Sequence, residues 1–385
     1  MRICYVLLSP TFGMHQYTAD LANRMAQAGH DVSLVTTRHY PRDRYLPAIR
    51  VSTPVDTEDT GFSADALRLS GARDAQTEIG SLLPDVVHIT GPHAWNVSLL
   101  WLLRQAAIPV IHSLHDMDPH TGTPYGRLLT LWNQGILRQA DHLLVHGLCY
   151  RKRLLQRGVL PERVTYTPLL HLSLGQAWLE KIETLSDGIQ YEPWALFFGR
   201  LERYKGVDHL LAAAMTLDCF QSNGPRLVLA GPGRLDSLWA RSLPPGVEVR
   251  GHLIGDDEAV DLFRRCGALV LPYRDATQSA LVAHAYFFRK PVIVTRAGAL
   301  PEYVVEGETG WVIPPEDPQA LAEVLGEALS DTNRLACMGT AGRAWYERER
   351  KAEELTLRQM YSRLARFGTT PVGGQVNTDG SRRIG

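Results

Sequence analysis

The chain has 385 residues, more than one ordinary hydrophobic core holds, so its length predicts two domains. Its formal net charge of −1 argues against a nucleic acid partner and against a strongly basic membrane-binding protein. The five cysteines have no metal-like spacing and predict reduced thiols in a cytoplasmic protein. The apolar run at 3–8 is short and leads into turn residues, so we expect a strand there and not a signal peptide. No apolar run reaches the roughly 18 residues that a membrane-spanning helix needs.

The first half predicts one doubly wound α/β domain, residues 1–171, because apolar strand-like runs alternate with helical periodicity. Strands are predicted at 3–8, 32–36, 86–89, 110–113, 142–145 and 164–167. Helices are predicted at 16–28, 72–83, 97–107, 128–139 and 149–157, and an acidic turn region at 54–62. This alternation implies parallel strands joined by right-handed crossovers, as in a Rossmann-like domain.

The second half repeats the pattern after a polar, irregular stretch at 172–193, which we interpret as a hinge. Strands are predicted at 195–198, 226–230, 247–250, 268–271, 292–295 and 311–313. Helices are predicted at 207–215, 258–266, 280–288 and 318–330, and a long charged helix at 335–367 with a break near Gly342. The second domain is therefore placed at 194–345, and the polar tail 368–385 is predicted to be disordered. Two such domains form a cleft between the carboxyl ends of their strands, where ligands bind.

Arg200 and Lys205 follow the end of a predicted strand, in the stretch from Leu196 to Gly206. Gly199 lets the chain turn tightly, which places Arg200 and Lys205 at the carboxyl edge of the sheet. An arginine can fork onto two phosphate oxygens and a lysine adds a point charge, so the pair suits a diphosphate. On this stretch alone, an ordinary charged turn is an equally good interpretation.

Glycines recur at successive strand ends of the second half: Gly199, Gly231, Gly233, Gly251 and Gly298. Each one by itself is best explained as a turn, but five together favour a nucleotide site that the backbone approaches closely. The stretch from Asp275 to Leu281 opens a helix, and its amides could hold phosphate. The alternative is a helix cap without a ligand.

Histidines gather at the ends of two strands of the first half: His88, His93, His112, His115 and His120, with Asp116 beside them. A metal site is not favoured, because no pair has helical i, i+4 spacing and no cysteine joins them. A histidine next to Asp116 suits acid–base chemistry or contacts to substrate hydroxyls. His88 and His112 alternate with apolar neighbours, so buried structural roles stay open for them. Gly13 lies between the first strand and a helix, where its amide could meet a phosphate or a sugar.

Taken together, these residues resemble glycosyltransferase family four, a retaining, nucleotide-sugar-dependent group with the two-domain GT-B fold. The resemblance covers about residues 1–367 and is carried by short motifs in both halves. In the second half they are Gly199-Arg200, Lys205-Gly206, Ala230-Gly-Pro-Gly, Gly251-His-Leu, Gly298-Ala-Leu-Pro-Glu302 and Glu308-Thr-Gly-Trp. In the first half they are Gly13, Ala28-Gly-His-Asp-Val-Ser, Asp85-Val-Val-His88 and Ser113-Leu-His115-Asp116.

The resemblance implies a role for each matching position. Arg200 and Lys205 would bind the diphosphate of the sugar donor and stabilise it as it leaves. Backbone groups at Gly231–Gly233 and Gly251–Leu253 would hold the base, and Gly13 would approach the diphosphate from the other domain. Phosphate and ribose would meet Ser279, Ala280 and Leu281. His115 would lie beside the transferred sugar, with Asp116 and His93 on the acceptor side. The resemblance also implies that no metal or other cofactor is needed, that a UDP- or GDP-sugar is the substrate, and that the last helix, 346–367, returns to the first domain.

One departure from the family stands out, because its two glutamates eight residues apart are replaced here by Ala276 and His284. His284 could still bond to ribose hydroxyls, and the adjacent Asp275 could substitute for the first carboxylate. The predicted function is transfer of a sugar, with retention, to a glycan, a lipid-linked or a small-molecule acceptor. Two alternatives remain: a weak or inactive sugar-nucleotide binder, and a GT-B-fold epimerase of sugar nucleotides. The basic helix at 150–157 is either a solvated face or a weak peripheral contact with the inner face of the membrane.

Overall fold

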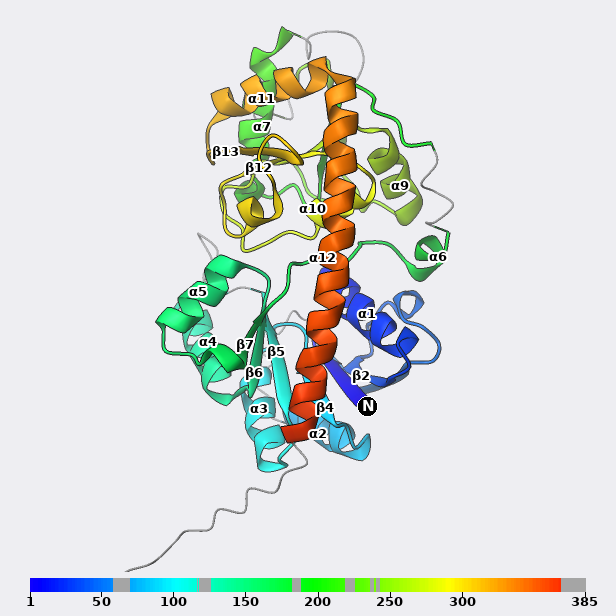
Figure 1. The fold of residues 1–385 in the computed structure, drawn as a ribbon, viewed down its shortest axis with the longest axis vertical. Helices are drawn as coiled ribbons and strands as arrows, with labels where there is room; N and C mark the ends of the chain where they lie inside the picture. The colour runs from blue at the N-terminus through cyan, green and yellow to red at the C-terminus, as the bar shows by residue number, and fades with distance from the viewer. Residues whose placement is uncertain are drawn as a thin grey trace, which may run out of the picture.

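The structure, a computed structural model, describes residues 1–57, 70–115, 117, 126–181, 188–218, 226–235, 239 and 243–367. It consists of two α/β domains, each built on a parallel sheet, and one long helix runs along both of them (Figure 1). This confirms the predicted fold class of two Rossmann-like domains. Asp116, His120 and the tail at 368–385 lie outside the described residues.

The first domain has a seven-stranded parallel sheet in the order β3-β2-β1-β4-β5-β6-β7. Its strands are β1 (Arg2–Leu7), β2 (Asp31–Thr37), β3 (Arg50–Val55), β4 (Val86–Ile89), β5 (Val110–Leu114), β6 (His142–Val145) and β7 (Val164–Tyr166). Its helices are α1 (Phe12–Gln27), η1 (Arg42–Arg44), α2 (Ser70–Ser81), α3 (Asn96–Gln105), α4 (Gly126–Gln139), α5 (Leu148–Gln156) and η3 (Pro161–Arg163).

The sheet of this domain is buried on both faces, with alternate residues of β1 entering opposite cores. Cys4 and Val6 pack on one side, and Ile3 and Tyr5 pack on the other. The sequence did not predict β3, whose end overlaps the stretch taken as a turn. Because β3 is an edge strand whose side chains are mostly only half-buried, it lacks the apolar run that marks the other strands.

The second domain has a six-stranded parallel sheet in the order β10-β9-β8-β11-β12-β13. Its strands are β8 (Ala195–Phe198), β9 (Leu227–Ala230), β10 (Val247–Arg250), β11 (Ala268–Leu271), β12 (Val292–Thr295) and β13 (Gly310–Ile313). Its helices are η5 (Arg203–Lys205), α7 (Val207–Thr216), α9 (Asp256–Arg265), α10 (Leu281–Phe287), η7 (Leu300–Tyr303) and α11 (Pro318–Ser330). The stretch predicted as a hinge contains the single-turn helix α6 (Gln176–Leu179).

Helix α12 (Thr332–Phe367) is 36 residues long and continuous, so the predicted break near Gly342 is wrong. A Cβ at Gly342 would lie 2.5 Å from Cδ1 of Tyr286, so this glycine lets α12 pack closely on α10. The first part of α12 enters the core of the second domain through Met338 and Trp345. Its last part packs against the first domain through Leu357 and Tyr361 (Figure 1). No described helix is both long enough and apolar enough to cross a bilayer.

Candidate functional site

The loops after β8, β9 and β10 pack against one another through glycines at the carboxyl edge of the second sheet. Gly231 has a φ of +145°, and a Cβ there would lie 2.2 Å from the carbonyl oxygen of Gly199. A Cβ on Gly233 would lie 2.9 Å from Cβ of Leu201, and one on Gly251 would lie 3.3 Å from the carbonyl oxygen of Gly233. Contacts between loops therefore require Gly231 and Gly233 and leave a side chain at Gly251 little room, and the predicted contacts of all three with a ligand stay a prediction. Leu253 follows on the same edge with 76% of its surface exposed.

Lys205 is held at this edge between the loops that follow β8 and β11. Its Nζ donates a hydrogen bond of 2.9 Å to the hydroxyl of Tyr273 and lies 4.3 Å from the centre of that ring. Burial acts to lower the pKa of Lys205, but the surrounding tyrosines outweigh it and the pKa lies above its ordinary value. A Cβ on Gly199 would lie 3.5 Å from Nζ and 4.0 Å from Cδ1 of Leu281. A fixed positive charge thus lies beside Gly199 and the start of α10.

Arg200 lies near the same tyrosine as Lys205, whose Nζ is 5.4 Å from the centre of the Tyr204 ring. The side chain of Arg200 is 64% exposed and pairs with Glu202 at 2.9 Å, and its Nη2 lies 3.5 Å from the hydroxyl of Tyr204. Both predicted cations therefore lie beside Tyr204, and their joint contact with a diphosphate stays a prediction. Because the Arg200–Glu202 pair is exposed to solvent, it is worth at most about 1 kcal/mol and can exchange for another anion.

The loop between β11 and α10 carries Ala276, one of the two positions where a family glutamate is replaced, and the other, His284, lies within α10. Asp275 is half-buried, whereas Ala276 is buried in the core of the second domain. Gly298 has a φ of +51°, and a Cβ there would lie 1.8 Å from the carbonyl oxygen of Ala276. The hydroxyl of Ser279 accepts a hydrogen bond of 3.4 Å from the amide of Leu281, the first residue of α10, and Ala280 is the N-cap.

His284 lies inside the second domain with its ring near Phe263 and Phe288, at centroid distances of 4.4 and 5.2 Å. Its Nδ1 accepts a hydrogen bond of 3.3 Å from the amide of Ser173, in the stretch predicted as a hinge. Burial lowers the pKa of His284 to about 3, so the ring is neutral. The predicted contact of His284 with ribose stays a prediction, since the described ring bonds to the amide of Ser173.

His115 lies at the end of β5 and meets the second domain directly. Its Nε2–H donates to the carbonyl oxygen of Thr90 at 2.9 Å, which leaves Nδ1 with a lone pair. Gln278 donates its amide hydrogen to the carbonyl oxygen of His115 at 3.0 Å, and the same nitrogen lies 3.5 Å from Nδ1. Sequence reasoning missed Gln278 as a site residue, although it stood inside the stretch singled out as a phosphate loop. The structure thus brings one predicted residue of the first half into contact with that loop.

The other residues predicted for the first-domain side of the site are Gly13, His93 and Asp116. Gly13 lies in the first turn of α1 and not in a loop, because α1 begins at Phe12, four residues earlier than predicted. A Cβ on Gly13 would meet nothing within 4 Å. His93 is buried, and its Nδ1 accepts a hydrogen bond of 3.2 Å from the amide of Trp95. Asp116 lies outside the described residues.

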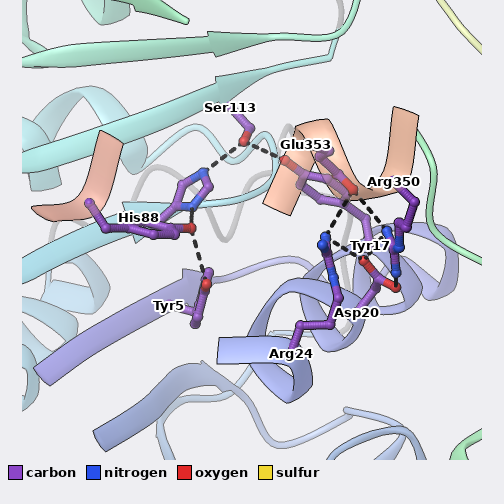
Figure 2. Close-up of polar contacts among 9 residues, drawn as sticks. Tyr5, Tyr17, Asp20, Arg24, His88, Ser113, Arg350 and Glu353 are labelled. Atoms are coloured by element: carbon purple, nitrogen blue, oxygen red, sulfur yellow. Dashed lines mark hydrogen bonds and ion pairs between the residues drawn. The ribbon is translucent and has the colours of Figure 1, made fainter. Parts of the chain in front are cut away.

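His88 has the buried structural role that the sequence left open. Its Nδ1 lies 2.6 Å from the hydroxyl of Tyr361 on α12, and its Nε2 lies 2.8 Å from the hydroxyl of Ser113 (Figure 2). His112 is also buried, with its Nε2 at 3.1 Å from the side-chain amide of Asn96. Within the described part of the chain, no three His, Cys, Asp or Glu side chains are grouped so as to hold a metal ion.

Two family profiles match the sequence, one in each half. "Glycosyl transferase 4-like domain" matches residues 12–169, and "Glycosyl transferases group 1" matches residues 192–331. The D-inositol 3-phosphate glycosyltransferase of Corynebacterium urealyticum is 30% identical over 94% of this chain and 92% of its own length. The glycogen synthase of Mycobacterium tuberculosis is 24% identical over 83% of each chain.

Solved structures show the same fold. A sucrose-phosphate synthase from Thermosynechococcus elongatus matches with a TM-score of 0.73 and 20% identity, over 94% of this chain and 99% of its own. The Anabaena protein HepE in complex with UDP and glucose matches with a TM-score of 0.68 and 14% identity, over 94% of this chain and all of its own, 100%. Both halves match glycosyltransferase profiles in the order of the GT-B fold, and the chain therefore belongs to glycosyltransferase family four.

Proposed function

We propose that the chain transfers a sugar, with retention of configuration, from a nucleoside diphosphate sugar to a hydroxyl of a glycan, a lipid-linked or a small-molecule acceptor. The observation that carries the proposal is Lys205, a charged side chain fixed by Tyr273 beside Gly199 and the start of α10. In such a transfer the nucleoside diphosphate leaves with growing negative charge. A cation that is already in place stabilises that charge without reorganisation.

Arg200 is proposed as the second cation on the diphosphate. It would exchange its exposed pairing with Glu202 for the phosphate oxygens, to which its guanidinium can bond in pairs. The packed loops with Gly231, Gly233 and Gly251 would offer backbone groups to the base, and the exposed Leu253 would offer it an apolar contact. Gly13 has open space beside it, which suits a close approach to the diphosphate from the first domain. UDP in a structural relative supports the choice of UDP-sugars as the first candidates.

The transferred sugar is proposed to lie next to His115 and Gln278. Because the amide nitrogen of Gln278 already donates to His115, its Oε1 is the group left to accept a hydrogen bond. That oxygen is buried and finds no hydrogen-bond donor among the described residues. A sugar hydroxyl is a suitable donor for it. Asp275 is proposed to supply the carboxylate that the family glutamate replaced by Ala276 would otherwise bring to the sugar.

The proposal is tested first by nucleotide binding to a Lys205→Ala variant. Loss of a charged hydrogen-bonding group should weaken UDP binding by roughly 1.5–3 kcal/mol, measured by calorimetry with UDP, GDP and ADP. Lys351→Ala, which removes an exposed lysine of α12, is the matched control and should bind as the unmodified chain does. Equal UDP affinity in the two variants would remove Lys205 from the diphosphate site.

Transfer itself needs an acceptor, and the names of the relatives indicate where to begin. D-inositol 3-phosphate is the first acceptor to test, followed by short glucans, with UDP-glucose among the sugar donors. The anomeric configuration of the product, read by NMR, tests retention. A product with the inverted configuration would contradict that part of the proposal.

A weak or inactive sugar-nucleotide binder is the rival function, and one observation favours it. Neither Ala276 nor His284 brings a carboxylate to the edge of the sheet, and both side chains are buried. Turnover well above solution background, lost in Asp275→Asn, would exclude this rival. An epimerase would isomerise a UDP-sugar without an acceptor, so a strict acceptor requirement excludes that alternative as well.

Peripheral contact with a membrane is the last part of the proposal. Helix α5 carries Arg151, Lys152 and Arg153, with Arg157 directly after it, and the neighbouring Leu148 and Leu160 are about half exposed. Such a surface could rest on anionic lipid headgroups. The contact is supported if the protein floats with anionic vesicles and not with neutral ones, and if the charge reversal Lys152→Glu abolishes this flotation. Equal behaviour with both vesicles would exclude it.

A further inference from the structure

Glu302, the last residue of the Leu-Pro-Glu motif, reaches across to the first domain. Its carboxylate accepts hydrogen bonds from the amides of Leu148 at 2.6 Å and of Cys149 at 2.8 Å. These are the first two residues of α5, whose amides have no partner within the helix. The residue before them is Gly147, which has no side chain that could cap the helix. A carboxylate from the second domain therefore provides the cap that α5 lacks, and it also carries the charge that a helix N-terminus favours.

The residues on either side of Glu302 make contacts with the same loop of the first domain. Tyr303 donates its hydroxyl hydrogen to the carbonyl oxygen of His146, and accepts a hydrogen bond of 3.2 Å from the amide of Leu169. Ala299 is fully buried among side chains of the first domain's core. A Cβ on Gly147 would lie 2.7 Å from Cβ of Ala299, so Gly147 is needed for this close approach. Helix η7 is thus docked on the first domain by a charged cap, a tyrosine and an apolar contact.

The docked helix is joined rigidly to the loop that holds Gln278. The amide of Ala299 donates to the carbonyl oxygen of Thr277 at 2.9 Å, and Gly298 lies against the carbonyl oxygen of Ala276. On the first domain, the rings of His115 and His146 lie 5.3 Å apart. One unit of the second domain therefore contacts His146 through Tyr303 and His115 through Gln278. When η7 is docked, Gln278 is in place at His115.

We infer that Glu302 is a positioning residue for the transfer reaction: by capping α5 it holds the two domains in the arrangement that sets Gln278 against His115. This inference rests on the proposed function. Glu302 does not touch the reacting atoms in this role. If Glu302 only stabilised α5, its loss would not change the rate of sugar transfer. A change in kcat/KM therefore separates a positioning role from a purely structural one.

Cys149 is a built-in reporter of this contact. Burial, together with the adjacent Glu302 carboxylate, raises the pKa of the Cys149 thiol to about 12, which keeps it unreactive while η7 is docked. Cys337 is exposed on α12 and serves as an internal reference in the same sample. Alkylation by iodoacetamide, resolved by peptide mass spectrometry, therefore reports the loss of burial together with the loss of the Glu302 charge, without any need for substrate. The part due to undocking is the excess in Glu302→Ala over Glu302→Gln, because both variants lack the charge.

The test compares substitutions at Glu302 that remove one or both of its accepting oxygens. Glu308→Gln, at an exposed glutamate between η7 and β13, is the matched control. Glu302→Gln keeps one accepting oxygen and Glu302→Ala keeps none. We expect Cys149 alkylation to rise in that order, by about fivefold or more in Glu302→Ala, with Cys337 unchanged. The kcat/KM for transfer should fall in the same order, by about tenfold in Glu302→Ala, while UDP affinity and thermal stability change little. Glu302→Asp should recover part of both.

Two outcomes would overturn the inference. One is protection of Cys149 in Glu302→Ala, because η7 would then be docked without the carboxylate. The other is undocking with kcat/KM unchanged, because Glu302 would then serve the fold alone. If the unmodified chain transfers no sugar, the proposed function fails on its own. The alkylation series then decides whether Glu302 holds the domains together.

Discussion

The two domains of this glycosyltransferase are held in shape by different kinds of contact. At the carboxyl edge of the second sheet, backbone lies on backbone through Gly199, Gly231 and Gly233. Where α12 packs on the first domain, polar side chains that are buried or largely buried, such as Tyr5, His88 and Arg350, hold the two together (Figure 2). Contacts of the first kind leave glycines at regular places in the sequence. Contacts of the second kind join residues far apart in the chain and leave no local pattern.

The largest effect is expected where the side-chain contacts carry charge. Arg350 pairs with Asp20 on α1 and with Glu353 at 3.0 Å, and Arg24 forms ion pairs with the same two carboxylates at 3.0 and 3.2 Å (Figure 2). Arg350→Ala would leave the buried Glu353 and the largely buried Asp20 facing one arginine, which should cost about 3–5 kcal/mol of stability. Urea unfolding followed by circular dichroism measures the loss, and hydrogen exchange in α1 locates it.

The control for this variant is Arg348→Ala on the same helix. Arg348 is 65% exposed and pairs with Glu349, so its loss should cost less than about 1 kcal/mol. If Arg350→Ala is no more destabilising than Arg348→Ala, the buried cluster does not hold α12 on the first domain.

Acid should weaken the first domain before it affects the backbone-built edge. Burial lowers the pKa of His15, His142 and His171 to about 4 each. Because these values lie below the roughly 6.5 of an unfolded chain, the unfolded state takes up protons first as the pH falls. The stability from each neutral histidine is therefore complete above about pH 6.5 and is lost as the pH falls towards 4. At about pH 5.5 the loss should be about 1 kcal/mol for each of them.

Denaturation at about pH 7.5 and at about pH 5.5 measures how the free energy of unfolding depends on pH, and hydrogen exchange shows which domain loses stability. An equal stability at the two pH values would show that the buried histidines are not neutral in the folded chain.

Gly231 is the position where a side chain would most disturb the packed loops at the carboxyl edge of the second sheet. Its left-handed φ and its contact with the carbonyl oxygen of Gly199 leave no room for a side chain, so Gly231→Ala should cost about 1–3 kcal/mol. Gly13→Ala should not destabilise, because that position is helical and open. It should instead weaken binding of the nucleotide sugar if the backbone of Gly13 meets the diphosphate. Calorimetry with UDP and thermal unfolding separate the two kinds of glycine.

This contrast explains how much could be predicted from the sequence. Buried parallel strands and glycine turns are local patterns, so each predicted strand, the two-domain fold and the edge around Gly199 were found. The edge strand β3 was missed because its residues are half exposed, and Gly342 was misread because its helix-packing role depends on Tyr286. The docking of Glu302 on Leu148, 154 residues earlier in the chain, has no local signature at all. The roles of Asp275, Ser279 and His284 in binding the sugar donor stay predictions.

Gln278 is where the two kinds of contact meet, and the smallest effect is expected there. Its amide lies on the second domain's loop and donates to the carbonyl oxygen of His115 in the first domain. Gln278→Ala removes one neutral hydrogen bond, which should cost about 1 kcal/mol, seen as about a fivefold fall in kcat/KM with stability almost unchanged. Gln278→Glu keeps the shape of the side chain, but a carboxylate has no hydrogen to give the carbonyl oxygen. It should therefore lose at least as much activity as the alanine variant. Full activity in Gln278→Glu would mean that the contact with His115 is a by-product of domain closure, and that the sugar is positioned by other residues.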